Sequence, residues 1–262
     1  MIALLLFIFG LIVGSFLNVV IFRLHSGKSF VKGRSACPHC GHELSALDLV
    51  PVLSFILLKA RCRYCRNRIS WQYPLVEIIT GLSFALIGFS SDQFTLLVFT
   101  KLIFASVMIV VAVYDLKHFL ILDKVLVPAI VAALVLNAIL DANSACSLLS
   151  INCHSLGGLA AAALACFFFL AQYMLSGGKW IGFGDVKFGI LLGLIAGWPG
   201  ILALLFLAYV IGAATGLGLM AAGKKTMTSK LPFGTFLGLA AILTMAFGSG
   251  LVAWYLNLIG IQ

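Results

Sequence analysis

The sequence predicts an all-α polytopic membrane protein with about eight transmembrane helices and one small cytoplasmic insert between the first two. Three observations lead to this fold class. Hydrophobic residues make up 63% of the 262-residue chain and charged residues 10%, at a mean hydropathy of +1.17. No soluble domain can bury that much apolar surface. Apolar runs recur along the chain, most of them near the roughly 20 residues needed to span a bilayer, and one long polar stretch, 23–73, interrupts them.

The first apolar run covers residues 2–22. It lacks a basic region before it and a small-residue cleavage site after it, so we expect a retained transmembrane helix rather than a signal peptide. We accordingly expect three parts: a first helix at 1–22, a polar insert at 23–73, and a seven-helix membrane domain at 74–262.

The polar insert is strongly basic. Nine of the seventeen Lys and Arg residues lie between Arg23 and Arg68. In a soluble protein this would suggest nucleic acid, but beside so many apolar runs it indicates a cytoplasmic loop near anionic lipid headgroups, with no nucleic-acid partner. The apolar run 49–58 inside it is too short to span and is expected to pack on the insert or lie along the interface.

The remaining spans are predicted at 75–89, 94–113, 124–140, 156–175, 186–196, 201–222 and 232–258. With the insert in the cytoplasm, alternation places the Lys-containing loops on the same side and leaves the opposite loops without Lys or Arg. Only Lys101, inside a span, fits poorly. Both termini are then expected outside. We read the glycines of the last spans as close helix-packing positions: Gly212, Gly216 and Gly218.

Two CxxC pairs lie in the insert, Cys37/Cys40 and Cys62/Cys65, separated by 21 residues. Two such pairs complete a tetrahedral four-thiolate site, and a reducing cytoplasm disfavours disulfides. We therefore predict a closed, structural zinc site that folds a loop poor in core; a thiol redox pair is the alternative. His39 and His42 are possible substitute ligands but are expected to be bystanders.

The other cysteines fall outside the insert. Cys146 and Cys153 share a predicted outer loop, where an oxidising exterior permits a disulfide, and the sequence leaves open whether one forms. Cys166 lies in an apolar run and reads as a small buried residue.

Two carboxylates at membrane boundaries are the candidates for chemistry. Asp185 follows Gly182 and Gly184, glycines that permit close backbone approach or positive φ, and Asp115 closes an earlier apolar run. Carboxylates at membrane depth are costly and usually functional, although each alone could simply cap a helix. Both fall at the predicted cytoplasmic ends of their spans, so they can meet in one site.

Two adjacent carboxylates share a proton, so one can activate water while the other polarises a carbonyl. This is the arrangement of an aspartic protease. Two alternatives come from other classes: a transporter that relays protons or cations through Asp115 and Asp185, and a zinc-dependent membrane scaffold. No interrupted segments recur in two halves, as inverted repeats would require.

Other charged residues receive supporting or structural roles. Glu77 is expected to pair with a loop cation or to line the site. Asp123 is expected to cap the following helix and, with Gly182, Gly184 and Lys187, to support the site around Asp185. Four further acids read as ordinary loop residues: Glu43, Asp48, Asp92 and Asp141.

The sequence resembles the type IV prepilin peptidases, bifunctional leader peptidase/N-methyltransferases, over nearly its whole length. The resemblance rests on these motifs in this order: Gly14-Ser15-Phe16-Leu17-Asn18-Val19-Val20, the paired CxxC motifs, Tyr73-Pro74-Leu75-Val76-Glu77, Asp115 with Asp123, Gly182-Phe183-Gly184-Asp185-Val186-Lys187, and Pro232-Phe233-Gly234.

The resemblance implies a GxGD-type aspartic protease of the bacterial inner membrane, with Asp115 and Asp185 as its catalytic pair. It implies cleavage of basic leaders from type IV prepilins and type II secretion pseudopilins on the cytoplasmic side. It further implies methylation of the new N-terminus with S-adenosylmethionine. Leu122, Trp180 and Thr235 depart from residues common in the family, and none of the three is expected to touch the aspartates.

Overall fold

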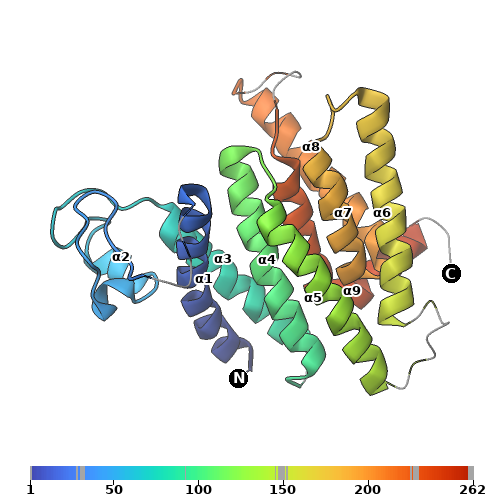
Figure 1. Ribbon diagram of the computed structural model, residues 1–262, viewed down its shortest axis with the longest axis horizontal. Coiled ribbons are helices and arrows are strands. Elements are labelled where there is room, and N and C mark those ends of the chain that lie inside the picture. Colours follow the sequence, from blue (N-terminus) through green and yellow to red (C-terminus); the bar gives the residue numbers. More distant parts are fainter. Residues whose placement is uncertain are drawn as a thin grey trace. The chain divides into compact units, whose positions relative to one another are not determined.

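The computed structural model describes residues 2–27, 29, 33–91, 93–144, 146, 151, 153–224, 226 and 230–258. This part of the chain is helical, with no β-strand, and the predicted fold class is confirmed. Eight helices have 14 residues or more (Figure 1): α1 (Ile2–Ser26), α3 (Gln72–Phe89), α4 (Leu96–His118), α5 (Asp123–Ser144), α6 (His154–Ser176), α7 (Phe183–Ala196), α8 (Gly200–Ala221) and α9 (Phe233–Leu258).

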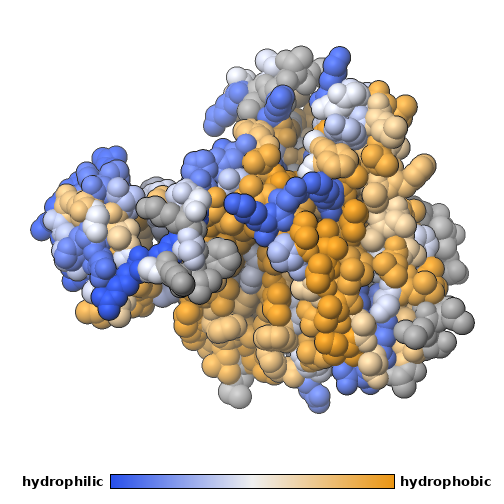
Figure 2. Space-filling view, in the orientation of Figure 1, coloured by the Kyte–Doolittle hydropathy of each residue, from blue (hydrophilic) through white to orange (hydrophobic). Residues whose placement is uncertain are grey.

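Six of these helices are long and apolar enough to cross a membrane: α1, α3, α4, α5, α6 and α8. Helix α7 has only 14 residues, in keeping with the short sixth span expected from the sequence. Helix α9 has 26 residues, and its stretch Phe233–Gly248 is apolar as well. The sides of the helices carry mostly apolar residues (Figure 2), as lipid contact requires.

The chain forms two compact units, Met1–Phe94 and Thr95–Gln262. In the first, α1 and α3 pack with their backbones in contact. A Cβ added at Gly14 would lie 2.7 Å from the Cα of Glu77, and one at Gly10 would lie 2.8 Å from the Cα of Gly81. Small residues permit such close crossings between membrane helices, where packing rather than hydrophobicity drives association. The side chain of Asn18 joins the two helices by donating to the Tyr73 carbonyl at 3.0 Å.

The insert between α1 and α3 holds two short helical segments, η1 (Ala46–Leu49) and α2 (Leu53–Leu57). They account for the apolar run 49–58, which is indeed too short to span. Two of the acids read as loop residues hold this insert together. Glu43 pairs with Arg34 at 2.9 Å, and Asp48, whose side chain is only 3% exposed, pairs with Arg63 at 2.7 Å. Asp92 lies outside the described residues.

In the second unit, α6 packs on α7, and α9 packs on both α4 and α8. The closest approach is at Gly193 of α7, where an added Cβ would collide with the backbone of Ala161 and Ala162 in α6. The expectation for the later glycines is wrong at Gly218, around which nothing lies within 4 Å. At Gly212 and Gly216 an added Cβ would meet only side chains. The tight crossing therefore involves the short helix α7.

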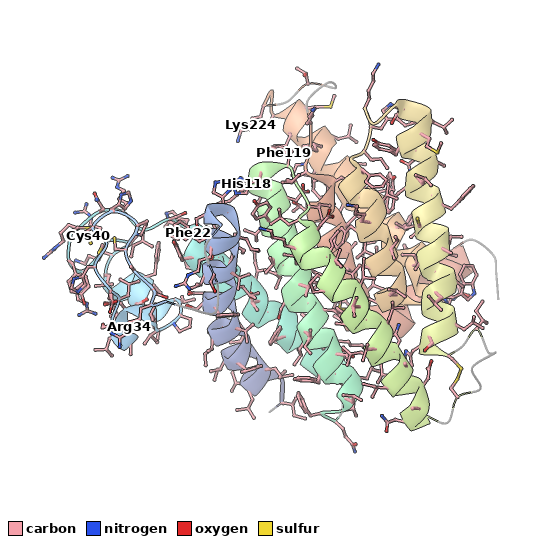
Figure 3. All side chains as sticks on the ribbon, viewed as in Figure 1. Phe22, Arg34, Cys40, His118, Phe119 and Lys224 are labelled. Atoms are coloured by element: carbon pink, nitrogen blue, oxygen red, sulfur yellow. A yellow bond between two sulfur atoms is a disulfide. The ribbon has the colours of Figure 1, made fainter. Side chains whose placement is uncertain are left out.

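The two ends of the second unit are distinct. The connections after α4, α6 and α8 lie at one end, where Figure 3 labels His118, Phe119 and Lys224, and those after α5 and α7 lie at the other (Figure 1). This arrangement agrees with the alternation expected from the charges. Lys225, which belongs to the Lys-containing loop after α8, lies outside the described residues.

At the second end Asp141 proves to be structural rather than an ordinary loop residue. It lies in α5, and its carboxylate accepts the backbone N–H groups of His154 and Ser155 at 2.7 Å each, which caps the start of α6. Close by, Cys146 and Cys153 form a disulfide, the outcome that the sequence left open.

Candidate active site and metal centre

Asp115 lies in the last turn of α4 and is buried, with 5% of its surface exposed. Its carboxylate accepts the backbone N–H of Thr235 at 3.1 Å, and the Thr235 hydroxyl donates to the carbonyl of Ala112 at 2.9 Å. Thr235 belongs to the first turn of α9, where unpaired N–H groups and the helix dipole both favour a negative charge. The start of α9 therefore holds one carboxylate in place.

Asp185 lies in the first turn of α7 and is also buried, at 8% exposed. Its carboxylate accepts the N–H of Gly182 at 3.0 Å, the residue that caps the helix. An acid at the third helical position that bonds back to the cap is a common way to begin a helix. The same bond fixes the side chain at the helix start.

One hydrophobic residue lies against the glycines beside both aspartates. An added Cβ at Gly184 would be 3.1 Å from Ile121, and one at Gly234 would be 3.0 Å from Ile121 and 2.9 Å from a carboxylate oxygen of Asp115. Gly184 and Gly234 thus let the 119–122 connection and two helix starts converge. Asp115 and Asp185 lie close enough for their charges to interact. Asp115 lies at the end of α4 and Asp185 at the start of α7, beside glycines that Ile121 contacts; that the two aspartates form one catalytic site stays a prediction.

Of the two roles considered for the motif glycines, only close approach applies. Gly182 has a φ of −81°, which any residue adopts, and an added Cβ would meet nothing nearer than 3.6 Å. Gly184 is not in the positive-φ region either. Its lack of a Cβ instead makes room for the side chain of Ile121. Of the two, Gly184 is the constrained position.

Asp123 and Lys187 form an ion pair beside the site. The Lys187 ammonium donates to both carboxylate oxygens of Asp123 at 2.8 Å and lies 5.3 Å from the ring centroid of Phe183. The expectation that Asp123 caps a helix is wrong, because α5 begins at Asp123 itself and its carboxylate is engaged by Lys187. The pair ties the start of α5 to the first turns of α7, and both side chains are partly exposed.

Glu77 belongs to the other unit. It is buried in α3, and its carboxylate accepts the backbone N–H of Val52 at 2.8 Å, which ties the insert to the membrane helix. Among the described residues it forms no ion pair with a loop cation, but Lys28 and Lys32 of that loop lie outside them, so the pairing stays a prediction. Its supporting role at the active site stays a prediction.

The two CxxC motifs fold into matching turns. In the first, Cys37 N–H donates to His42 and Gly41 N–H donates back to Cys37; in the second, Cys62 and Arg66 repeat the pattern with Asn67. Each turn is closed by an antiparallel bridge, Ala36 with Glu43 and Arg61 with Arg68. The repeated turns bring all four sulfur atoms within 4.8 Å of one another.

This cluster fits a zinc ion. A tetrahedron of thiolates at about 2.3 Å from zinc places its sulfurs about 3.8 Å apart, and the Cys37 and Cys65 sulfurs are 3.8 Å apart. Although burial opposes it, hydrogen bonds from the backbone of Cys40 and His39 lower the pKa of the Cys37 thiol to about 7. Despite a backbone hydrogen bond at Asn67, burial and the neighbouring thiols raise the pKa of Cys65 to about 11. A cation is the partner that would let all four ionise together.

The histidines beside the first motif are not part of the cluster. His42 stacks on Tyr64 with ring centroids 3.6 Å apart. The group of candidate ligands within 4.8 Å of one another in the described part of the insert consists of the four cysteines alone.

Comparison with known proteins identifies the family. Residues 8–90 match the bacterial peptidase A24 N-terminal domain, and residues 102–217 match the type IV leader peptidase family. The chain is 32% identical to a prepilin leader peptidase/N-methyltransferase of Bacillus subtilis, over 97% of each chain. The chain belongs to the type IV leader peptidase family.

Other relatives carry the same name. The protein of Aeromonas hydrophila is 30% identical over 97% of this chain and 93% of its own length. That of Burkholderia pseudomallei is 33% identical over 92% of this chain and 84% of its own. No solved structure matches the chain. The first leader peptidase match contains the four cysteines and Glu77, and the second contains both aspartates with Asp123 and Lys187.

Three contacts of the leader peptidase site were missed from the sequence. Thr235 was expected not to touch the aspartates, yet its N–H bonds to Asp115; a proline there has no N–H to donate. Ile121 carries no polar signal. The Tyr209 hydroxyl donates to Gln172 at 2.9 Å and lies within electrostatic reach of Asp185. The one available signal was that Gln172 and Tyr209 interrupt two apolar runs.

Proposed function

We propose that this protein is a membrane-embedded aspartic endopeptidase with Asp115 and Asp185 as its catalytic pair. The observation that carries the proposal is the placing of two buried carboxylates at one end of the membrane helices, each hydrogen-bonded to a helix start. Buried carboxylates without a cation partner are costly, which makes them functional candidates in a membrane. The names of the relatives support the same activity, and they give no support to a transporter.

The chemistry follows from two carboxylates that share one proton. The ionised aspartate takes a proton from a water molecule, whose oxygen attacks the scissile carbonyl carbon. The protonated aspartate donates its proton toward the carbonyl oxygen, which stabilises the tetrahedral intermediate. Collapse of that intermediate breaks the C–N bond, and a carboxyl group protonates the leaving amine. Thr235 N–H and Gly182 N–H hold the two carboxylates in position throughout.

The substrates are prepilins and pseudopilins, whose basic leaders are removed on the cytoplasmic side of the bacterial inner membrane. This inference rests on the family and on the relatives named prepilin leader peptidase/N-methyltransferase. The same names support methylation of the new N-terminal residue with S-adenosylmethionine as methyl donor. No constellation in the described residues is specific enough to place that cofactor, so we derive no step through it.

The insert is a structural zinc site in this proposal, held by Cys37, Cys40, Cys62 and Cys65. Four protein ligands leave no open coordination position for catalysis. Phe55, at 8% exposed, is the only large apolar side chain that is buried in the described part of the insert, so the metal takes over part of the stabilising role of a core.

Zinc content tests the insert. We expect about one zinc per chain in the purified protein, and Cys37→Ser or Cys65→Ser should lower it because each removes one of four ligands. Cys166→Ser is the control, since Cys166 lies in α6 outside the cluster and should leave the zinc unchanged. Metal analysis that finds none in carefully prepared wild type would favour the redox alternative.

Labelling of single cysteines tests the orientation. In a background without native thiols, a cysteine at Lys224 should react only from the cytoplasm and one at Asn143 only from outside. Lys224 follows α8 and Asn143 lies in the last turn of α5, and the connections after these two helices lie at opposite ends of the second unit. The reverse pattern at either position would contradict the proposed topology.

Asparagine substitutions test the catalytic pair. Asp115→Asn and Asp185→Asn keep size and shape but remove the acid–base function, which contributes roughly 10²–10⁴-fold. Loss of half of a cooperating pair can cost more than that share. Both variants should insert and fold, yet leave a model prepilin uncleaved.

The control for this test is Asp123→Asn, which weakens only an exposed ion pair and should retain substantial cleavage. If methyl transfer uses a separate site, all three variants should methylate a substrate supplied already cleaved. Near-normal cleavage by Asp115→Asn or Asp185→Asn would rule out the mechanism. Loss of prepilin cleavage in Asp123→Asn would mean that Asp115 and Asp185 are not the catalytic pair.

A further inference from the structure

The second CxxC turn carries an unusual pairing of charges. Arg61 and Arg68 lie opposite each other in an antiparallel bridge, a position where like charges repel. The corresponding bridge of the first turn pairs Ala36 with Glu43, whose charge is matched by Arg34. The second turn therefore maintains a repulsion that the first avoids.

No acidic residue of the insert forms an ion pair with Arg61 or Arg68. Glu43 and Asp48 are the only acids in residues 23–73, and they pair with Arg34 and Arg63. Together with Lys59, the two arginines line a hollow of about 350 Å³ that Ala60, Ile69 and Trp71 complete. Within the described residues these three cations have no ion-pair partner. The hollow is thus concave and positively charged, and no carboxylate of the insert balances its charge.

The position of the hollow along the chain fixes its depth. Trp71 lines it and directly precedes α3, whose 18 residues extend about 27 Å at 1.5 Å per residue. That length is slightly shorter than the roughly 30 Å hydrocarbon core, so a membrane-spanning α3 has its start close to the headgroup level. Tryptophan is enriched at this depth.

An apolar surface adjoins the hollow. Helix α2 exposes Leu53, Ile56 and Leu57 by 58%, 62% and 80%, and its Phe55 packs edge-on against Trp71 with ring centroids 5.0 Å apart. In Figure 2 apolar and hydrophilic atoms lie side by side on this insert. Exposed apolar residues beside cations are the composition of a surface that lies in a membrane interface.

We propose that the hollow formed by Lys59, Arg61, Arg68 and Trp71 binds the phosphate of an acidic phospholipid headgroup. The planar guanidinium groups suit bidentate phosphate binding, and a phosphate between them would relieve their repulsion. The depth fixed by α3 makes the lipid, rather than a soluble phosphate, the source. The bound headgroup fastens the insert to the membrane surface next to the metal site.

Amide hydrogen exchange of the full-length protein in nanodiscs tests this site. Replacing part of the phosphatidylcholine by phosphatidylglycerol should slow exchange in residues 53–71, because a ligand that binds the folded insert suppresses its opening. In Arg61→Gln/Arg68→Gln, the factor by which phosphatidylglycerol slows exchange should be about thirty-fold smaller than in wild type, as expected for the loss of two cations near an anionic surface. In phosphatidylcholine alone this variant should exchange no faster than wild type, because the repulsion is gone.

The matched control removes two other arginines of the same insert. Arg34→Gln/Arg66→Gln has the same net charge but leaves the hollow intact, so it should keep the response to phosphatidylglycerol. Inorganic phosphate added to phosphatidylcholine nanodiscs should leave wild type unchanged. The proposal is overturned if phosphatidylglycerol has no effect on wild type, if both double variants respond alike, or if inorganic phosphate alone reproduces the slowing.

Discussion

The proposed active site depends on one packing contact, that of Ile121 against Gly184 and Gly234. Three segments far apart in the sequence meet there: the connection after α4, the start of α7 and the start of α9. Because neither glycine has a Cβ, the segments approach until Asp115 reaches the N–H of Thr235. Two buried carboxylates that repel each other have no reason to stay near one another, and this close packing with its helix-start hydrogen bonds supplies one.

The surrounding helices stabilise the packing of Ile121 against Gly184 and Gly234. Helix α7 is short, and Gly193 lets its last turn touch the backbone of α6, so the helix is held at both ends. The Lys187–Asp123 pair ties that turn to the start of α5, which follows Ile121 by two residues. The insert with its cysteine cluster is organised separately, by its own paired turns and by the bond from Val52 to Glu77. The two folded regions thus have independent stabilising interactions.

Much of this architecture could be predicted because hydropathy, charge asymmetry and CxxC spacing are local signals. The helices, the four-cysteine cluster and the place of the two aspartates at one end all follow from them. The contacts of Thr235, Ile121 and Asp141 could not be predicted in this way, since each joins residues distant in the sequence through backbone groups or apolar surface. Asp123 was misread for a related reason: its partner Lys187 lies 64 positions away, whereas a helix cap is a local pattern.

The most direct measurement compares prepilin cleavage by Gly234→Ala and Gly218→Ala. The first variant changes neither aspartate but places a methyl group 2.9 Å from a carboxylate oxygen of Asp115 and 3.0 Å from Ile121, so the carboxylate must move. A misplacement of this kind costs about 10²-fold in rate, while the second variant adds its methyl group where nothing lies within 4 Å. The account predicts a cleavage defect near that size for Gly234→Ala, with normal insertion, and none for Gly218→Ala. Equal, near-normal cleavage by both variants would contradict it.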